Sequence, residues 1–257
     1  MLQIEPIPAF SDNYIWLLRD DAGEEAWVVD PGDAQPVIDR LDGLNLNLTG
    51  VIITHHHFDH VGGLDSLCAK YQCRVYGPHN PAITQVTDRL ADGDVATVLG
   101  REFRVLEVPG HTLDHIAYFH DSDQPVLLCG DTLFAGGCGR VFEGTAPMMH
   151  KSLRSLAALP AATRVYCAHE YTLANLAFAS AVEPGNVALQ ERVSEAQATR
   201  ARDEATVPST IGLELATNPF LRCESGDLVA SLREQGKLAG ETGDEVFATV
   251  RSWKDNF

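Results

Sequence analysis

Basic residues are scarce in this chain of 257 residues. It carries 19 Lys and Arg against 36 Asp and Glu, which gives a formal net charge of -17 at pH 7. A surface with this excess of negative charge repels nucleic-acid phosphates and anionic lipid headgroups. We therefore do not expect nucleic acid or a membrane surface as a partner.

Long hydrophobic runs, an export signal and paired cysteine motifs are also lacking. No apolar stretch approaches the roughly 20 residues of a membrane span. The N-terminal segment Met1 to Pro6 has no basic stretch followed by a hydrophobic run. The six cysteines are scattered without C-x-x-C spacing, which argues against a disulfide framework in a chain of this length. We expect a reduced, soluble, cytoplasmic protein, with a monomer as the default.

Hydrophobic residues make up 45% of the chain, enough for a substantial core. Short strands, turns and a few helices fill the chain up to about residue 170, and the pattern beyond is mainly helical. We predict a mixed α/β domain over residues 1–170 and a smaller helical domain over residues 171–257. The strands are expected over 13–19, 25–30, 51–53, 103–108, 115–119, 126–129 and 165–167. The helices are expected over 37–41, 64–71, from near 147, 173–182, 187–205, and twice after an irregular stretch over 207–220.

The segment Thr54 to His60 places four possible metal donors within six residues, in the pattern H-x-H-x-D-H. His55, His57 and Asp59 have the same parity after a strand, so they can lean toward one point, and His60 joins them where the chain turns. Imidazole and carboxylate donors suit zinc, and also iron or manganese. A solvated histidine cluster is the alternative, but it would not explain the donors found downstream.

Three further donors, His111, Asp131 and His169, each follow closely behind a predicted strand. Loops beyond strand ends are where sheet-based enzymes assemble their sites. A single histidine in such a place is more often structural. Three donors together, downstream of the H-x-H-x-D-H box, indicate that they belong to one metal site.

Seven donors exceed the four ligands of a closed structural zinc site. The number predicts two divalent ions about 3.5–4 Å apart, with a shared carboxylate and open positions for water. We expect His55, His57 and His111 at one ion, Asp59, His60 and His169 at the other, and Asp131 bridging them. Zinc is the ion we expect first. A hydroxide between the ions is the expected nucleophile, because both ions stabilise its negative charge.

With these donors, the T-H-x-H-x-D-H box resembles the metallo-β-lactamase superfamily. The full pattern is closer to one family within it, the glyoxalase II enzymes, or hydroxyacylglutathione hydrolases. The matching segments are Thr54 to Gly63, Pro109 to Thr112, Gly130 to Phe134, Gly137 to Thr145, Ala168 to Thr172, Asn218 to Phe220 and Arg251 to Phe257. The resemblance implies an αββα sandwich with the metals at one edge, followed by a smaller C-terminal α-helical domain.

The resemblance also implies an activity, the hydrolysis of S-D-lactoylglutathione and other S-2-hydroxyacylglutathiones to a 2-hydroxy acid and glutathione, the second step of methylglyoxal detoxification. A bridging hydroxide and a Lewis-acidic metal suit a thioester carbonyl, which becomes an oxyanion on attack. The leaving thiolate needs little protonation. This explains why no separate general acid and no Ser-His-Asp arrangement is found, and we expect no catalytic residue apart from the metal ligands.

Glutathione is a net anion, so an acidic chain must bind it through local positive charge. By position in the family's pattern, the expected substrate contacts are Arg140, Phe142, Tyr171, Arg251 and Lys254. Arg251 and Lys254 are spaced i, i+3 on the last predicted helix and can point the same way. Phe142 stands where some members have tyrosine, so one hydroxyl contact is absent. Arg140 stands where lysine is common, and it keeps the charge.

The other histidines and two cysteines receive no ligand role. His56 has the wrong parity for the box and is expected beside the site or in solvent, and His115 is expected to be structural or to orient a ligand. The remaining histidines, His79, His120 and His150, are expected at the surface. Cys129 and Cys167 are expected to pack within strands.

Other functions on the same scaffold stay open. A lactonase or a β-lactamase would share the metal box, but such enzymes generally lack the helical domain with its terminal basic pair. An iron-dependent persulfide dioxygenase resembles this family, yet the retained Asp59 and His60 favour a second metal. The net charge disfavours a nuclease, and the complete donor set disfavours a non-catalytic binding module.

Overall fold

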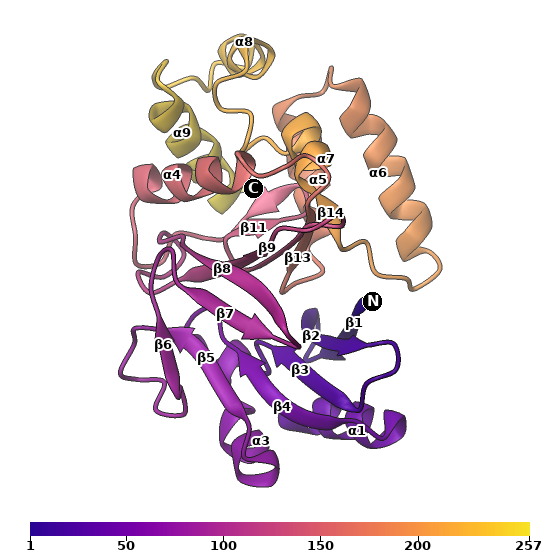
Figure 1. The fold of residues 1–257 in the computed structure, drawn as a ribbon. Helices are drawn as coiled ribbons and strands as arrows, with labels where there is room; N and C mark the ends of the chain where they lie inside the picture. Colours follow the sequence, from indigo (N-terminus) through magenta and orange to yellow (C-terminus); the bar gives the residue numbers. More distant parts are fainter. The chain divides into compact units, whose positions relative to one another are not determined.

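The computed structural model describes all residues, 1–257, and confirms a mixed α/β fold with a helical C-terminal part (Figure 1). The chain forms two compact units. The first unit comprises Met1–Val108 and Asp114–Gly130, and the second comprises Pro109–Leu113 and Asp131–Phe257. None of the helices combines the length and the apolar character that crossing a membrane requires.

The first unit begins with a six-stranded sheet in the order β1-β2-β3-β4-β5-β6. Its strands are β1 (Leu2–Ala9), β2 (Asn13–Asp20), β3 (Glu25–Val29), β4 (Asn47–Ile52), β5 (Arg74–Pro78) and β6 (Asp88–Leu90). The predicted hairpin of β2 and β3 is confirmed, and pairing from β3 to β6 is parallel. The edge strand β1 was not predicted, because Pro6 and Pro8 weaken its pattern, although prolines are tolerated at a sheet edge.

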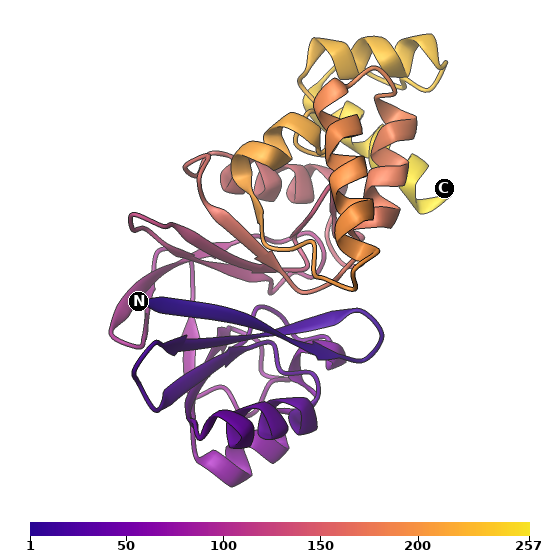
Figure 2. The same cartoon turned by 90° about the vertical axis from the view of Figure 1, so that its right-hand side faces the viewer.

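Two helices cover the outer face of this sheet, as the indigo and purple helices of Figure 2 show. They are α1 (Ala34–Leu44), between β3 and β4, and α3 (Leu64–Tyr71), which follows β4 through the short α2 (Phe58–Val61). Buried apolar residues of both helices, such as Leu41 and Leu67, share a core with Val51 of β4. The helix predicted over 64–71 is confirmed. The helix α1 is longer than predicted because Asp33 caps its N-terminus by accepting from the Gln35 N–H.

The first unit also contains four antiparallel strands of a second sheet, in the order β10-β9-β8-β7. They are β7 (Val95–Val98), β8 (Arg101–Glu107), β9 (Ile116–His120) and β10 (Val126–Gly130). The fully buried Tyr118 of β9 donates a hydrogen bond from its hydroxyl to the carbonyl of Ile53, 2.9 Å away. This bond ties the second sheet to the end of β4, where the metal box begins.

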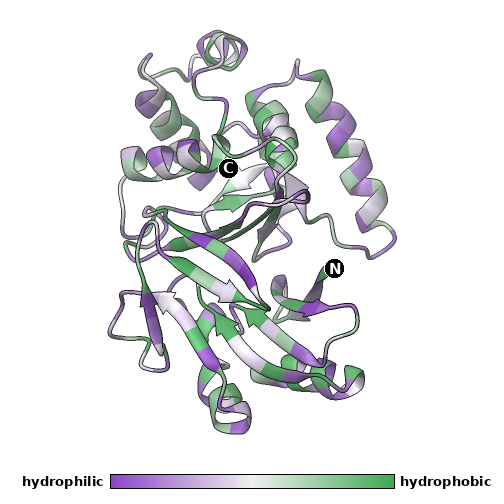
Figure 3. Ribbon diagram, viewed as in Figure 1, coloured by the Kyte–Doolittle hydropathy of each residue, from purple (hydrophilic) through white to green (hydrophobic).

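The second unit is mainly helical. It contains the hairpin of β11 (Leu133–Phe134) and β12 (Gly137–Cys138), the paired strands β13 (Arg164–Cys167) and β14 (Ser209–Thr210), and the helices α4 (Ala146–Ala157), α5 (Thr172–Val182), α6 (Val187–Arg200), α7 (Ile211–Thr217), α8 (Gly226–Glu234) and α9 (Gly243–Asp255). Figure 3 shows hydrophobic residues gathered in the strands and polar residues spread along α6.

Two sequence predictions in this unit were wrong. The stretch 207–220 is irregular only at its ends, since it contains β14 and the helix α7, which Thr210 caps by accepting from the Leu213 N–H. His150 is not a surface residue. It is 2% exposed, its Nδ1 lies 2.7 Å from Oδ1 of Asp244, and its ring stacks on Phe247 of α9. These partners come from a distant part of the chain, so the local sequence around His150 did not reveal them.

Candidate metal centre

The H-x-H-x-D-H box starts in the loop after β4 and is anchored by Asp30, which sequence analysis did not single out. Thr54 donates two hydrogen bonds to the Asp30 carboxylate, one from its N–H at 2.8 Å and one from its hydroxyl at 2.7 Å. Oδ2 of Asp30 also lies 3.1 Å from Nδ1 of His60. Asp30 is 4% exposed and has φ 50, in the left-handed region. The only sequence signal was an Asp-Pro-Gly turn directly after an apolar strand.

The four donors of the first unit lie together. His55 and His60 are fully buried, with ring centroids 4.1 Å apart, and the half-buried His57 has its ring centroid 4.8 Å from that of His55. Oδ2 of Asp59 lies 3.4 Å from Nε2 of His60 and accepts a hydrogen bond from Nδ2 of Asn13 at 3.0 Å. The turn at α2 therefore brings these four side chains together, as their close spacing in the sequence predicted. The sequence did not reveal that Asn13 would hydrogen-bond to Asp59.

The other histidines near the box do not join the donors in the same way. The ring of His115 stacks on that of His55, with centroids 4.6 Å apart. His56 is half-buried, and its Nδ1 lies 2.9 Å from Oδ1 of Asp114. Asn80 donates to the other oxygen of Asp114 at 2.7 Å. His56 therefore has Asp114 as its polar partner, while its ring lies edge-on to that of His57, with centroids 5.1 Å apart.

The three donors of the second unit are also buried and mutually close. Oδ2 of Asp131 lies 3.5 Å from Nε2 of His111 and 3.4 Å from Nε2 of His169. Nδ1 of His111 lies 2.8 Å from the carbonyl oxygen of Arg140, which directs the opposite ring nitrogen to Asp131. Gly139 lies so close to Asp131 that a Cβ on it would be 1.9 Å from the Asp131 carbonyl oxygen. Only glycine allows this approach.

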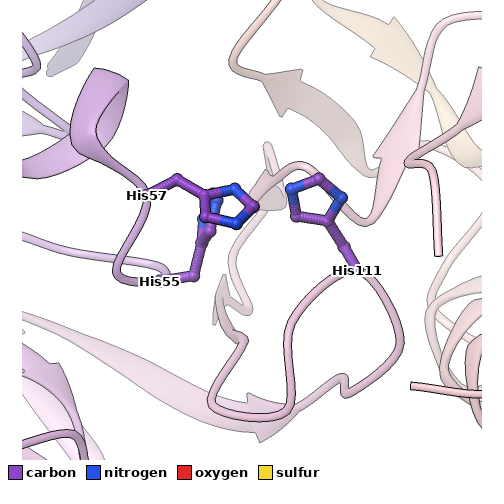
Figure 4. Close-up of side chains that lie close together, drawn as sticks. All are labelled: His55, His57 and His111. Atoms are coloured by element: carbon purple, nitrogen blue, oxygen red, sulfur yellow. The ribbon is translucent and has the colours of Figure 1, made fainter. Parts of the chain in front are cut away.

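The donor atoms form three sets, each with ligand atoms within 4.8 Å of one another: His55, His57 and His111; His55, His60 and Asp131; and Asp59, His60 and His169. Figure 4 shows the rings of the first set turned toward one another. The first and third sets share no member, so two ions can be held at once. Imidazole nitrogens and carboxylate oxygens without thiolate fit a catalytic zinc, iron or manganese centre. The fold and these clusters together indicate a binuclear metal site.

Two cysteines next to the donors lie within buried strands. Cys129 and Cys167 are fully buried in β10 and β13, as predicted. Burial raises the pKa of the Cys167 thiol to about 12, and its Sγ donates to the carbonyl of His169 at 3.6 Å. Neither cysteine belongs to a group of side chains close enough together to hold a metal ion.

Three of the residues expected to contact substrate are accessible. Phe142 is 60% exposed and its ring lies edge-on to that of His111, with centroids 5.3 Å apart. The exposed Arg140 guanidinium lies over the Phe142 ring. Tyr171 is 37% exposed and stacks on the ring of His169 at 4.7 Å. Basic and aromatic side chains therefore lie beside the donors of the second unit.

The two basic residues of α9 are more enclosed. Arg251 is 8% exposed, donates to the carbonyl of Cys138 at 3.2 Å and pairs with Asp255 at 2.9 Å. The Lys254 ammonium donates to the carbonyl of Ala174 at 3.1 Å. Burial, and then repulsion from Arg251, lower the pKa of Lys254 below its usual value. The sequence did not predict that Arg251 would be engaged with β12.

Comparison with known proteins assigns both parts of the chain to described families. Residues 10–169 match the model of the metallo-beta-lactamase superfamily, and residues 170–257 match the model of the hydroxyacylglutathione hydrolase C-terminus. Among solved structures, ETHE1 from Myxococcus xanthus has a TM-score of 0.66 and 26% sequence identity, covering 99% of this chain and 98% of that one.

Curated relatives match over the full length. A hydroxyacylglutathione hydrolase of Chromohalobacter salexigens is 52% identical over 257 residues, and one of Pseudomonas aeruginosa is 53% identical over 258 residues. In both cases the match covers 100% of this chain and 100% of the relative. The chain therefore belongs to the hydroxyacylglutathione hydrolase family of the metallo-β-lactamase superfamily.

Proposed function

We propose that this protein hydrolyses glutathione thioesters of 2-hydroxy acids, with S-D-lactoylglutathione as the first substrate to test, to release glutathione and the hydroxy acid. The observation that carries the proposal is the pair of donor sets with no shared member, in a chain that matches both parts of the family. Two catalytic ions suit the attack of water on a thioester carbonyl better than one closed structural ion would.

We propose that His55, His57 and His111 hold one ion, that Asp59, His60 and His169 hold the other, and that Asp131 bridges them. The near-equal distances of Asp131 to His111 and His169 support the bridging role. Two divalent ions, with zinc expected first, would activate a water molecule and polarise the thioester carbonyl. The protein's own contribution is to fix the seven side chains. Asp30 orients His60, and the Arg140 carbonyl orients His111.

For the glutathione moiety, we propose contacts with Arg140, Phe142, Tyr171, Arg251 and Lys254. Exposed Arg140 can pair with a carboxylate of glutathione, and the rings of Phe142 and Tyr171 offer apolar surface beside the donors. Arg251 and Lys254 now donate to backbone carbonyls. Each keeps further N–H donors that an incoming carboxylate could use.

We also propose that residues 1–170 form the metal-binding catalytic domain and residues 171–257 the substrate-binding domain. The two family models meet between residues 169 and 170, which supports this division. The compact units follow a different division, since residues 131–170 pack with the helices. A monomer in the cytoplasm is part of the proposal, and the six free cysteines suit a reducing compartment.

The test measures loss of thioester absorbance with S-D-lactoylglutathione, with metal content determined on the same sample. We expect turnover with about two metal ions per chain, abolished by a chelator and restored by added zinc. A fully metallated sample without thioesterase activity would contradict the proposal. In that case a lactone, a β-lactam and glutathione persulfide, assayed on the same sample, would identify the alternative, and a single tightly held iron would favour the persulfide.

A further inference from the structure

The turn between β11 and β12 forms hydrogen bonds with side chains of α5, of α7 and of Asn218, which follows α7. The N–H of Gly136 donates to Oε2 of Glu214 at 2.8 Å. Nδ2 of Asn218 donates to the carbonyl of Gly137 at 2.9 Å, and Nδ2 of Asn175 donates to that of Ala135 at 3.2 Å. Gly136 has φ 70, in the left-handed region. A hairpin with strands of two residues has too few ladder bonds to be stable alone, so these side chains fix it.

Glu214 is the centre of this arrangement. Its side chain is fully buried, and its carboxylate accepts from Arg192, Ser209 and Asn218 in addition to Gly136. Arg192, itself 5% exposed, also donates to the Thr217 hydroxyl at 2.6 Å. A buried carboxylate is tolerated only when it is paired and fully hydrogen-bonded. Glu214 meets this condition, and one of its hydrogen bonds comes from the hairpin backbone, from the Gly136 N–H.

The hairpin controls the surroundings of all three donors in the second unit. It begins two residues after Asp131, and Gly139, directly after β12, lies against the Asp131 carbonyl. The next residue, Arg140, supplies the carbonyl that orients His111. Phe134 of β11 packs edge-on against the ring of His169, with centroids 5.8 Å apart. A displaced hairpin would therefore move Asp131, His111 and His169 together.

We propose that Glu214, paired with Arg192 and assisted by Asn218, is a positioning group of the metal centre. It acts through the hairpin of β11 and β12 and touches neither substrate nor metal. An apolar cluster of the same size could supply comparable stability, but it would leave the Gly136 N–H and the Gly137 carbonyl without directed partners. The kinetic part of this inference rests on the proposed function, whereas the metal-binding part does not.

The experiment compares three variants in the full-length protein. Glu214→Gln keeps the size of the side chain but replaces one acceptor oxygen by a donor. Asn218→Ser removes the amide that donates to the hairpin and leaves the ion pair between Glu214 and Arg192 in place. The control is Glu183→Gln, since Glu183 is also buried and forms an ion pair, with Arg222 at 2.8 Å, but does not contact the hairpin. For each variant we would measure Tm, zinc affinity in competition with a chromophoric chelator, and kcat and KM for S-D-lactoylglutathione.

We expect Glu214→Gln and Asn218→Ser to bind zinc about 10-fold more weakly or worse, with a reduced kcat. Glu183→Gln should lose Tm but keep the wild-type zinc affinity. The inference is overturned if the two hairpin variants, at a similar loss of Tm, bind zinc as the control does. If Glu214→Gln fails to fold, Asn218→Ser decides alone. A wild-type protein without thioesterase activity would contradict the proposed function, and the zinc comparison would still test the inference.

Discussion

Asp30 follows β3 and His60 lies in α2, yet the two meet beneath the metal box, with Oδ2 of Asp30 at 3.1 Å from Nδ1 of His60. The same carboxylate accepts both the N–H and the hydroxyl of Thr54. One buried side chain thus fixes the first residue of the box and its last donor, and Nε2 of His60 is directed to the other donors.

Replacing Asp30 should therefore weaken metal binding, although Asp30 is not itself one of the proposed metal ligands. Asn is the suitable substitution because it tolerates the left-handed backbone at φ 50. The Nδ2 group of the new amide cannot accept a hydrogen bond, so it would oppose either Thr54 or His60 where the carboxylate now faces both. We expect Asp30→Asn to lose about 10- to 100-fold in zinc affinity, measured by chelator competition. Asp33→Asn is the control, since Asp33 only caps α1. Equal zinc affinity in both variants would contradict this role for Asp30.

Lys254 should make substrate binding sensitive to alkaline pH. Its pKa lies below the usual value of 10.5, first because of burial and then because of Arg251. The ammonium is charged below this lowered pKa and neutral above it, so KM should rise as pH increases through it. Lys254→Arg should show a flatter profile, because a guanidinium stays charged throughout this range. Identical KM profiles for the wild-type enzyme and the Lys254→Arg variant would refute a contact with glutathione.

The same lowered pKa has a consequence for stability. Between the lowered and the normal pKa of Lys254, the folded state binds fewer protons than the unfolded state. The free energy of unfolding should therefore rise with pH across this window, as the cost of burying the charged ammonium disappears. Urea unfolding of the wild type and of Lys254→Met over this pH range would show the difference, since only the wild type carries this titration.

Arg140 should contribute to affinity and not to turnover. Its side chain is 63% exposed and its Nε is 3.9 Å from Asp255, so no strong local pair competes for it. We expect Arg140→Met to raise KM roughly 3- to 10-fold at low salt, less than a buried charged hydrogen bond would give, with little change in kcat. The effect should shrink as ionic strength increases. Arg233→Met, which removes an exposed charge paired with Glu241, is the control. A matching KM for both variants would exclude Arg140 from the substrate site.

Tyr118 should matter for stability. Burial raises the pKa of its hydroxyl, which stays protonated and donates to the Ile53 carbonyl at 2.9 Å. Tyr118→Phe leaves this buried carbonyl without that donor and should lower the free energy of unfolding by about 1–2 kcal/mol. Urea unfolding would show this as a lower midpoint with an unchanged slope. An unchanged midpoint would mean that the bond contributes nothing to the packing of the two sheets.

Much of the metal site could be predicted because its signals are local. His55, His57, Asp59 and His60 lie close together in the sequence directly after β4, and His111, Asp131 and His169 each follow a strand, where sheet-based enzymes place their sites. Part of β4 and the helix over 64–71 were also predictable, because a short apolar run between turn residues favours a strand and apolar residues at helical spacing favour a helix. The resemblance to a known family added the expected substrate contacts.

What the sequence could not show are contacts between residues far apart in the chain. Asn13 and Glu214 carry no local signal, and the Asp-Pro-Gly turn at Asp30 indicates a turn but not its partners, because these roles depend on the backbone and side chains that packing brings to each residue. His150 reads as a surface residue until Asp244 and Phe247 cover it. The sequence by itself determined the donor types, their order and the main strands and helices. Only the tertiary structure decided which buried groups hold those donors in place, because a buried polar group requires partners, and partners are chosen by packing.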